Sequence, residues 1–181
     1  MSEQKCIYTI GHSNRSLEDF ISMLRSFKIE LLADVRRFPA SRKYPHFNKT
    51  ELSEALEKEK ISYLHFETLG GRRAASKDSP NITWRHSAFR GYADYMETAA
   101  FNTAVRQMEK EAEKKLTAYM CSEAVWWSCH RSMISDYLKA AGWEVRHIME
   151  AGKWKEHPYT APARIENGEL TYRPARGLFD V

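Results

Sequence analysis

Strand-like apolar runs alternate with helical patterns along most of this chain, and that alternation restricts its fold more than any other feature. Short runs rich in apolar residues are typical of buried strands, and they cover residues 6–10, 31–35, 61–66, 116–120 and 143–148. Between them, apolar residues recur at helical spacing over residues 17–27, 48–60, 91–115 and 132–141. This order indicates a mainly parallel sheet with helices on its faces. We therefore expect a three-layer α/β sandwich with about five strands, and a partial β/α barrel stays open as the alternative.

The last part of the chain predicts a small hairpin. Residues 164–172 carry the pair Asn167-Gly168 between two short runs, and Asn-Gly is a preferred two-residue hairpin turn. At 181 residues, the chain is long enough for one domain with a substantial core and short for two. We expect a single α/β domain over residues 1–181, with its core in residues 5–149 and a C-terminal extension in residues 150–181.

Composition and charge narrow the class of protein. A formal charge of +4 permits a phosphate-bearing or nucleic-acid partner without requiring one. No apolar run is long enough to span a membrane, and polar residues 1–5 lead directly into a strand-like run, so we expect neither a membrane segment nor a signal peptide. Three cysteines cannot all pair, and their spacing does not suggest a secreted disulfide framework. A reducing cytoplasm is the expected location.

Polar groups follow four of the predicted strands. The carboxyl ends of parallel strands share one edge of the sheet, and open α/β sheets bind ligands there. In chain order, the groups at these strand ends are Gly11-His12-Ser13, then Asp34 and Arg36 followed by Arg42, then Gly70-Gly71-Arg72, and finally Cys121, Glu123, Cys129, His130 and Arg131. We expect them to converge on one polar site.

The segment from Cys121 to Arg131 is the densest of these groups. It lies between a strand-like run and a helix-like run, so it predicts a strand-to-helix turn. A sulfur at a helix N-terminus beside His130 and Arg131 favours the thiolate form of Cys129, a nucleophile or metal ligand. The alternative is that Cys129 is a small buried apolar residue at the start of a helix. We expect Cys121 to be packed in the interior.

Further residues at these strand ends are candidates for acid–base catalysis. Glu123 and Asp34 could act as general acid and base if their surroundings separate their pKa values. Asp34 could instead pair with Arg36, which lies on the same face of the strand by period-two spacing. His12 could face a ligand or make local hydrogen bonds. The candidate catalytic residues are therefore Glu123, Cys129, His130, His12 and Asp34.

The remaining polar residues at this edge suit an anionic substrate. Gly70-Gly71-Arg72 lacks the lysine and spacing of a nucleotide-triphosphate P-loop, and Gly11 stands without the rest of a dinucleotide-binding motif. Backbone N–H groups and guanidinium groups can nevertheless hold a phosphate. The candidate substrate-binding residues are Ser13, Arg36, Arg42, Asn48, Gly70, Gly71, Arg72 and Arg131.

A polar loop without periodicity covers residues 72–90. Trp84 and Phe89 could stack on bases while Arg85 and Arg90 contact phosphates, as in proteins that bind single-stranded nucleic acid. The alternative is a solvated lid whose aromatic side chains fold onto the core. Loops of this length in compact domains are usually functional or mobile.

Several of these motifs match a known family. Tyr8 to Ser13, Asp34 to Arg36 with Pro39 and Arg42, Phe47-Asn48, Leu69 to Arg72, and Cys121-x-Glu123 with Cys129-His130-Arg131 together resemble the domain-of-unknown-function family 488 (DUF488). The resemblance runs from about Tyr8 to Ile148. It implies a common α/β fold and a shared polar site, and it implies no particular reaction.

Three functions are compatible with the sequence. The first is an enzyme acting on a phosphorylated or nucleotide-like substrate. The second is a nucleic-acid-binding or repair-accessory module without catalysis. The third is a metal or thiol redox sensor built on Cys121 and Cys129, although their spacing differs from that of common zinc signatures. The sequence identifies no cofactor, no set of metal ligands and no oligomeric state.

Overall fold

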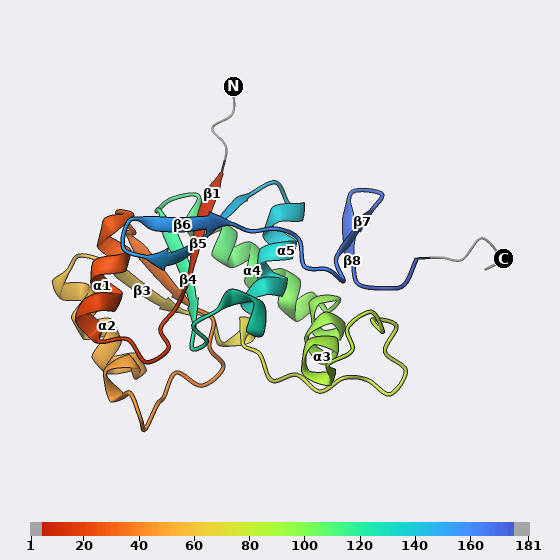
Figure 1. The fold of residues 1–181 in the computed structure, drawn as a ribbon, viewed down its shortest axis with the longest axis horizontal. Coiled ribbons are helices and arrows are strands. Elements are labelled where there is room, and N and C mark those ends of the chain that lie inside the picture. Colours follow the sequence, from red (N-terminus) through yellow and green to blue (C-terminus); the bar gives the residue numbers. More distant parts are fainter. Residues whose placement is uncertain (1–4, 176–181) are drawn as a thin grey trace.

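A computed structural model describes residues 5–175, and its centre is a six-stranded sheet with the order β3-β2-β4-β1-β5-β6 (Figure 1). The strands are β1 (Cys6–Gly11), β2 (Leu31–Asp34), β3 (Ser62–His65), β4 (Thr117–Cys121), β5 (Glu144–Glu150) and β6 (Lys153–Glu156). The first five are parallel, and β6 pairs antiparallel with β5. The sheet is open, because β3 and β6 form its two edges and do not pair with each other. The expected sandwich is confirmed, and the barrel alternative is wrong.

Helices cover both faces of the sheet and complete three layers (Figure 1). On one face, α1 (Leu17–Ser26) and α2 (Lys49–Lys58) pack against apolar side chains of the sheet. On the other face lie α3 (Ser87–Met96), α4 (Ala99–Ala112) and α5 (Arg131–Ala140). Successive side chains of β1 point to opposite faces of the sheet, so Tyr8 joins the hydrophobic core beneath α1 and α2, and Ile7 joins the core beneath α3, α4 and α5. Among residues 5–175, no helix combines the length and apolarity that crossing a membrane requires.

Two local expectations were wrong. The sequence predicts one helix over residues 91–115, whereas the structure has two, because Thr98 caps α4 by accepting a hydrogen bond from the backbone N–H of Phe101 at 3.3 Å. The sixth strand was not expected. All four residues of β6 are exposed, and a strand that buries neither face has no apolar pattern to reveal it.

The loop before α3 is held by a carboxylate rather than by regular structure. Residues 72–86 form no helix or strand. Asp94 accepts hydrogen bonds from the backbone of Ser76 and from the side chains of Ser79 and Asn81. Trp84 stacks on Phe89 with ring centroids 4.9 Å apart, and both rings pack against the core. The structure therefore has the aromatic side chains of this loop folded inward, which was the alternative to a base-stacking surface.

The expected hairpin is present near the end of the chain. Strands β7 (Arg164–Glu166) and β8 (Glu169–Thr171) flank Asn167 and Gly168, whose φ angles of 52° and 83° fit a turn that needs positive φ at both positions. Tyr172 follows β8 and is buried against the core.

Candidate functional site at the carboxyl edge of the sheet

A cavity of about 830 Å³ lies at the carboxyl ends of β1, β2 and β4. It brings together many of the residues that the sequence predicted to converge, namely His12, Ser13, Arg36, Gly71, Arg72, Glu123, Cys129 and His130. The lining also includes residues that were not predicted, such as Arg37, Phe38, Tyr44, Ser122 and Tyr92. We call this cavity the edge pocket. The sheet topology explains the convergence, because parallel strands release their carboxyl ends at one side.

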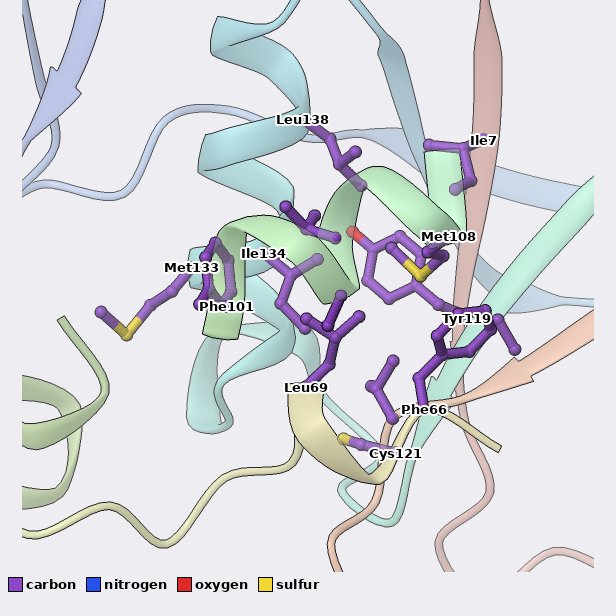
Figure 2. Close-up of a cluster of buried hydrophobic side chains, with 14 of the residues drawn as sticks. Ile7, Phe66, Leu69, Phe101, Met108, Tyr119, Cys121, Met133, Ile134 and Leu138 are labelled. Atoms are coloured by element: carbon purple, nitrogen blue, oxygen red, sulfur yellow. The ribbon is translucent and has the colours of Figure 1, made fainter. Parts of the chain in front are cut away.

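Two thiols meet at the inner wall of the edge pocket. Cys121 ends β4 and Cys129 directly precedes the N-cap residue of α5, so the segment between them must turn back, which the short 3₁₀ helix η3 (Trp126–Ser128) achieves. Their sulfur atoms are 2.8 Å apart. Both side chains are buried, yet both line the pocket. Figure 2 shows Cys121 at the margin of the hydrophobic cluster below α4 and α5, with Leu69 nearby.

The surroundings of the two thiols favour one thiolate. Burial raises the pKa of both groups, but at Cys129 the hydrogen bond from Cys121 and the positive charge of Arg131 outweigh burial and lower the pKa below its usual value. The backbone N–H of Arg131, in the first turn of α5, donates to the Cys129 sulfur at 3.4 Å. Burial and the negative charge on Cys129 raise the pKa of Cys121 well above its usual value. These surroundings favour negative charge on Cys129 and the proton on Cys121.

Arg131 supports the site from beneath and does not line the edge pocket. Its guanidinium is buried and donates from Nη1 to Thr9 Oγ1 at 2.9 Å and from Nη2 to the carbonyl oxygen of Glu123 at 2.8 Å. The backbone of the Glu123 loop also lies against Gly11, where a Cβ atom would be 1.8 Å from the same carbonyl oxygen. Glycine is therefore required at the end of β1, and Arg131 fixes the loop that carries Glu123.

His130 presents one ring nitrogen toward the glycine turn. Its Nε2 donates to the carbonyl oxygen of Val35 at 3.0 Å, which leaves Nδ1 as an acceptor. A Cβ atom on Gly71 would lie 2.9 Å from that Nδ1, so the close approach of backbone to imidazole depends on glycine. Burial lowers the pKa of His130, which keeps the ring neutral near pH 7 and able to accept a proton.

Asp34, Arg36 and His12 form a connected group. Asp34 is fully buried and accepts from Arg36 Nη2 at 2.6 Å and from the hydroxyl of Tyr63 at 2.6 Å. Arg36 Nη1 lies 3.3 Å from His12 Nε2 and donates to it, so His12 Nδ1 carries the proton and donates to the Ser13 carbonyl at 2.9 Å. The His12 ring stacks on Phe47 at 4.2 Å. Burial lowers the pKa of His12 to about 4.

This arrangement separates the roles of the three side chains. Asp34 does not line the edge pocket, and its ion pair with Arg36 is the alternative that the sequence left open. Both nitrogens of His12 are engaged, so the ring presents an aromatic edge and a neutral surface to the pocket. Arg36 lines the pocket with its charge matched by Asp34.

Arginine side chains surround an exposed aromatic ring at the mouth of the edge pocket. Arg37 and Arg72 place their guanidinium carbons 5.5 Å and 6.0 Å from the centroid of Phe38, whose side chain is 60% exposed. Arg37 Nη1 donates to the carbonyl oxygen of Arg72 at 3.0 Å, which ties the two segments together. Gly70 makes this possible, since a Cβ atom there would lie 2.6 Å from Arg37 Cα.

A family model described as domain of unknown function DUF488 matches residues 16–138. The chain belongs to the DUF488 family. The region that matches the DUF488 model contains lining residues of the edge pocket that the sequence predicted, including Arg36, Gly71, Arg72, Glu123 and Cys129. His12 and Ser13 lie just before this region. No match to the chain was found among curated proteins or among solved structures.

Some predicted site residues of this DUF488 protein lie outside the edge pocket. Besides Asp34 and Arg131, these are Arg42, Asn48 and Gly70. Arg42 is exposed to solvent, and Asn48 accepts a hydrogen bond from the backbone N–H of Ser41 at 2.6 Å, which shapes the loop before α2. Glu123 lines the pocket and its side chain is exposed. Within residues 5–175, no group of three or more His, Cys, Asp and Glu side chains is arranged to hold a metal ion.

The unpredicted lining residues differ in whether sequence could have found them. Arg37 and Phe38 directly follow Arg36 at the end of β2, so their place in the chain was a usable signal. Tyr92 belongs to the helical pattern of α3 and lines the pocket only because α3 packs beside η2 (Glu67–Leu69), where its hydroxyl donates to the Leu69 carbonyl at 2.7 Å. No local pattern indicates that contact.

A second polar cluster lies next to the edge pocket and is sealed from solvent. Thr9, His147, His157 and Asp136 form a chain in which each successive pair is 2.9 Å apart. We call it the histidine chain. Arg131 donates to Thr9 at one end, and Asp136 can only accept at the other, so each member donates to the next and both imidazoles carry their proton on Nε2. The hydroxyls of Thr160 and Tyr172 donate to the remaining oxygen of Asp136.

Proposed function

We propose that this DUF488 protein is an enzyme that acts on an anionic, phosphate-bearing substrate through the thiolate of Cys129. The observation that carries the proposal is the position of that sulfur. It lies on the wall of the edge pocket, accepts a hydrogen bond from a backbone N–H of the first turn of α5, and is 2.8 Å from the sulfur of Cys121. Cysteine nucleophiles are typically found in electropositive surroundings at helix N-termini with access to a pocket.

The charges that line the edge pocket support an anionic substrate. The pocket lining includes three arginines, Arg36, Arg37 and Arg72, and one carboxylate, Glu123. Asp34 neutralises Arg36, whereas no carboxylate of the described residues lies within ion-pair distance of Arg37 or Arg72. Guanidinium groups without a carboxylate partner suit a phosphate, which they bind through paired hydrogen bonds.

The finer proposal is a nucleotide-like substrate. Phe38 offers an exposed ring at the pocket mouth, and bases stack on such rings. A base on Phe38 would bring its phosphate within reach of Arg37 and Arg72. In this arrangement Cys129 attacks the substrate as the bond to the leaving group breaks. Glu123 or His130 then exchanges the proton with the leaving group and with the water that releases the product.

The test is selective alkylation in the presence of small phosphates. Iodoacetamide should modify Cys129 faster than Cys6 at pH 7, because burial raises the pKa of Cys6 and no cation-rich turn surrounds it. Peptide mass spectrometry would follow both sites in one sample, so that Cys6 serves as an internal control. AMP and inorganic phosphate should slow the reaction at Cys129 only, with AMP the stronger of the two. Equal rates at both cysteines, or no protection by either compound, would refute the proposal.

A non-catalytic nucleic-acid-binding role is the second candidate, and Phe38 is the observation that favours it. Trp84 and Phe89 pack against the core, whereas the ring of Phe38 is exposed at the pocket mouth and is free to stack on a base. Binding of a fluorescent single-stranded oligonucleotide should then weaken steeply with salt and be lost in Phe38→Ala. If the oligonucleotide does not bind at low salt, this role is excluded.

A further inference from the structure

We propose that Cys121 and Cys129 are a two-electron redox couple, which passes between a dithiol and an intramolecular disulfide and thereby switches the edge pocket off. The couple stands independently of any reaction in the pocket. Only the switching rests on the proposed function, because it requires that Cys129 be the nucleophile.

The distance between the two sulfurs is the first argument. At 2.8 Å, the gap exceeds the ~2.05 Å of a disulfide bond by less than an ångström, so small side-chain rotations are enough to form the bond. The two cysteines are eight positions apart in the chain, and η3 folds that connection so that the backbone need not open.

Access and isolation are the second argument. Both sulfur-bearing residues line the edge pocket, so a small oxidant can reach them from solvent. Cys6 cannot compete as a partner. Cys121 pairs with Gly11 at the far end of β1, and Gly11 lies five residue-to-residue steps of about 3.3 Å each from Cys6. A disulfide in the folded protein therefore joins Cys121 to Cys129.

The environment assigns a different role to each sulfur. Cys129 accepts the N–H of Arg131 at the start of α5, which stabilises negative charge and makes it the attacking atom. Cys121 ends a buried strand, and burial raises its pKa. It therefore stays protonated until Cys129 has reacted, and it then acts as the resolving thiol.

A hydroperoxide is the oxidant of suitable class, and the two steps balance. The Cys129 thiolate attacks the terminal peroxide oxygen and the O–O bond breaks, so that this oxygen and its hydrogen become the sulfenic acid on Cys129. The departing alkoxide takes one proton from solvent and leaves as the alcohol. Cys121 then attacks that sulfur, the S–O bond breaks, and water leaves as the disulfide forms. The two sulfurs lose two electrons in total, and the hydroperoxide is reduced to alcohol and water. A dithiol reductant reverses the change.

The experiment is titration of the purified protein with hydrogen peroxide, followed by thiol counting in denaturant and by intact mass. One equivalent should remove two of the three thiols, lower the mass by two hydrogen atoms, and yield a Cys121–Cys129 linked peptide. Cys6→Ser is the matched control and should lose both of its thiols at the same rate. Disulfides between molecules, or a Cys129 oxidised beyond sulfenic acid while Cys121 stays reduced, would overturn the proposal.

Two variants separate the roles of the sulfurs. Cys121→Ser should leave a sulfenic acid on Cys129 that dimedone labels, and Cys129→Ser should slow oxidation of Cys121 at least tenfold. Cys121→Ala serves as a second form of the first variant, and circular dichroism checks that each protein is folded. Absence of dimedone labelling in both folded Cys121 variants would contradict the assignment of Cys129 as the attacking atom.

The couple and the proposed function can fail separately. A disulfide that forms readily while AMP never protects Cys129 from alkylation supports the couple and refutes the phosphate-binding enzyme. Protection by AMP without any intramolecular disulfide supports the enzyme and refutes the couple. If both hold, the oxidised protein should show no alkylation of Cys129, and dithiothreitol should restore it fully.

Discussion

The edge pocket and the histidine chain both contain histidines and both are contacted by Arg131, yet they differ in how many of their polar atoms remain free to bind a ligand. In the histidine chain every side-chain nitrogen and oxygen of Thr9, His147, His157 and Asp136 has a protein partner. In the edge pocket the Cys129 thiolate, the exposed Glu123 and the guanidinium groups of the mouth retain capacity for a ligand.

The comparison shows that residue type alone does not tell a residue that stabilises the fold from a residue that is available for binding or catalysis. A histidine or aspartate whose hydrogen bonds are all made within the protein rigidifies its surroundings, because unmaking any of them in a low-dielectric interior is costly. A charged group that remains open to a cavity is a candidate for binding or catalysis. Asp34 is a stabilising residue of this sort, because it accepts hydrogen bonds from Arg36 and Tyr63, although it lies next to the edge pocket.

Loss of the thiolate should give the largest effect. Cys129→Ser should lower turnover of a phosphate-bearing substrate by at least about 10³-fold, because the nucleophile is removed while the fold is kept. Steady-state rates measure this, and urea unfolding should show a change in stability of only about 1 kcal/mol. Turnover that survives in Cys129→Ser would assign the chemistry of the pocket to another group.

Loss of the terminal acceptor in the histidine chain should affect stability instead. Asp136→Ala leaves the donors of His157, Thr160 and Tyr172 buried without a partner, so unfolding free energy should fall by about 3–5 kcal/mol. Urea denaturation checks the value, with Asp136→Asn as the milder control because it keeps acceptor oxygen. The folded variant should still show selective alkylation of Cys129. A loss below 1 kcal/mol would remove the distinction between the two clusters.

Acidification should destabilise both clusters through their neutral histidines. Burial lowers the pKa of His12 to about 4 and, with the positive charge of Arg131 adding to it, lowers that of His147 to about 2. In the unfolded chain both rings bind a proton near pH 6.5, so between pH 6.5 and 4 the unfolded state holds more protons and stability falls as the pH falls. The expected slope is up to about 1.4 kcal/mol per pH unit for each ring. Urea unfolding of His147→Gln over this range should show a shallower slope than the parent protein, and an unchanged slope would contradict the effect.

The smallest effect should come from the pocket mouth. Arg72→Ala should weaken protection of Cys129 by AMP about tenfold, which is the loss of one charge-assisted contact. Arg42→Ala is the matched control, since Arg42 is an exposed arginine outside the edge pocket. The comparison uses the AMP concentration that halves the alkylation rate. Equal losses in the two variants would show that the phosphate is attracted by general surface charge.

The sequence predicts the sheet and half of the candidate site for one physical reason. Parallel strands that are buried on both faces are short apolar runs, and whatever follows each run lies at the same edge, so His12, Arg36 and Cys129 could be grouped without coordinates. The break before Thr98 could not be seen, because the apolar pattern continues across it. Nor could β6, whose residues are exposed on both faces.

The histidine chain shows a different limit. His147 lies within a strand, His157 follows an exposed strand and Asp136 lies in a helix, so nothing local connects them. Sequence patterns reveal what a residue does for its own element. They do not reveal a hydrogen bond between elements that are adjacent only after the sheet has formed. The same holds for Asn48, whose amide shapes a loop rather than a pocket wall.

The contact between Tyr172 and Asp136 has a consequence for biosynthesis. The carboxylate sits in α5, but the hydroxyl that completes its coordination is translated 36 residues later, after the β7–β8 turn. A nascent chain that stalls on the ribosome before Thr160 therefore carries an interior carboxylate that still lacks three of its hydrogen bonds, two from Thr160 and one from Tyr172.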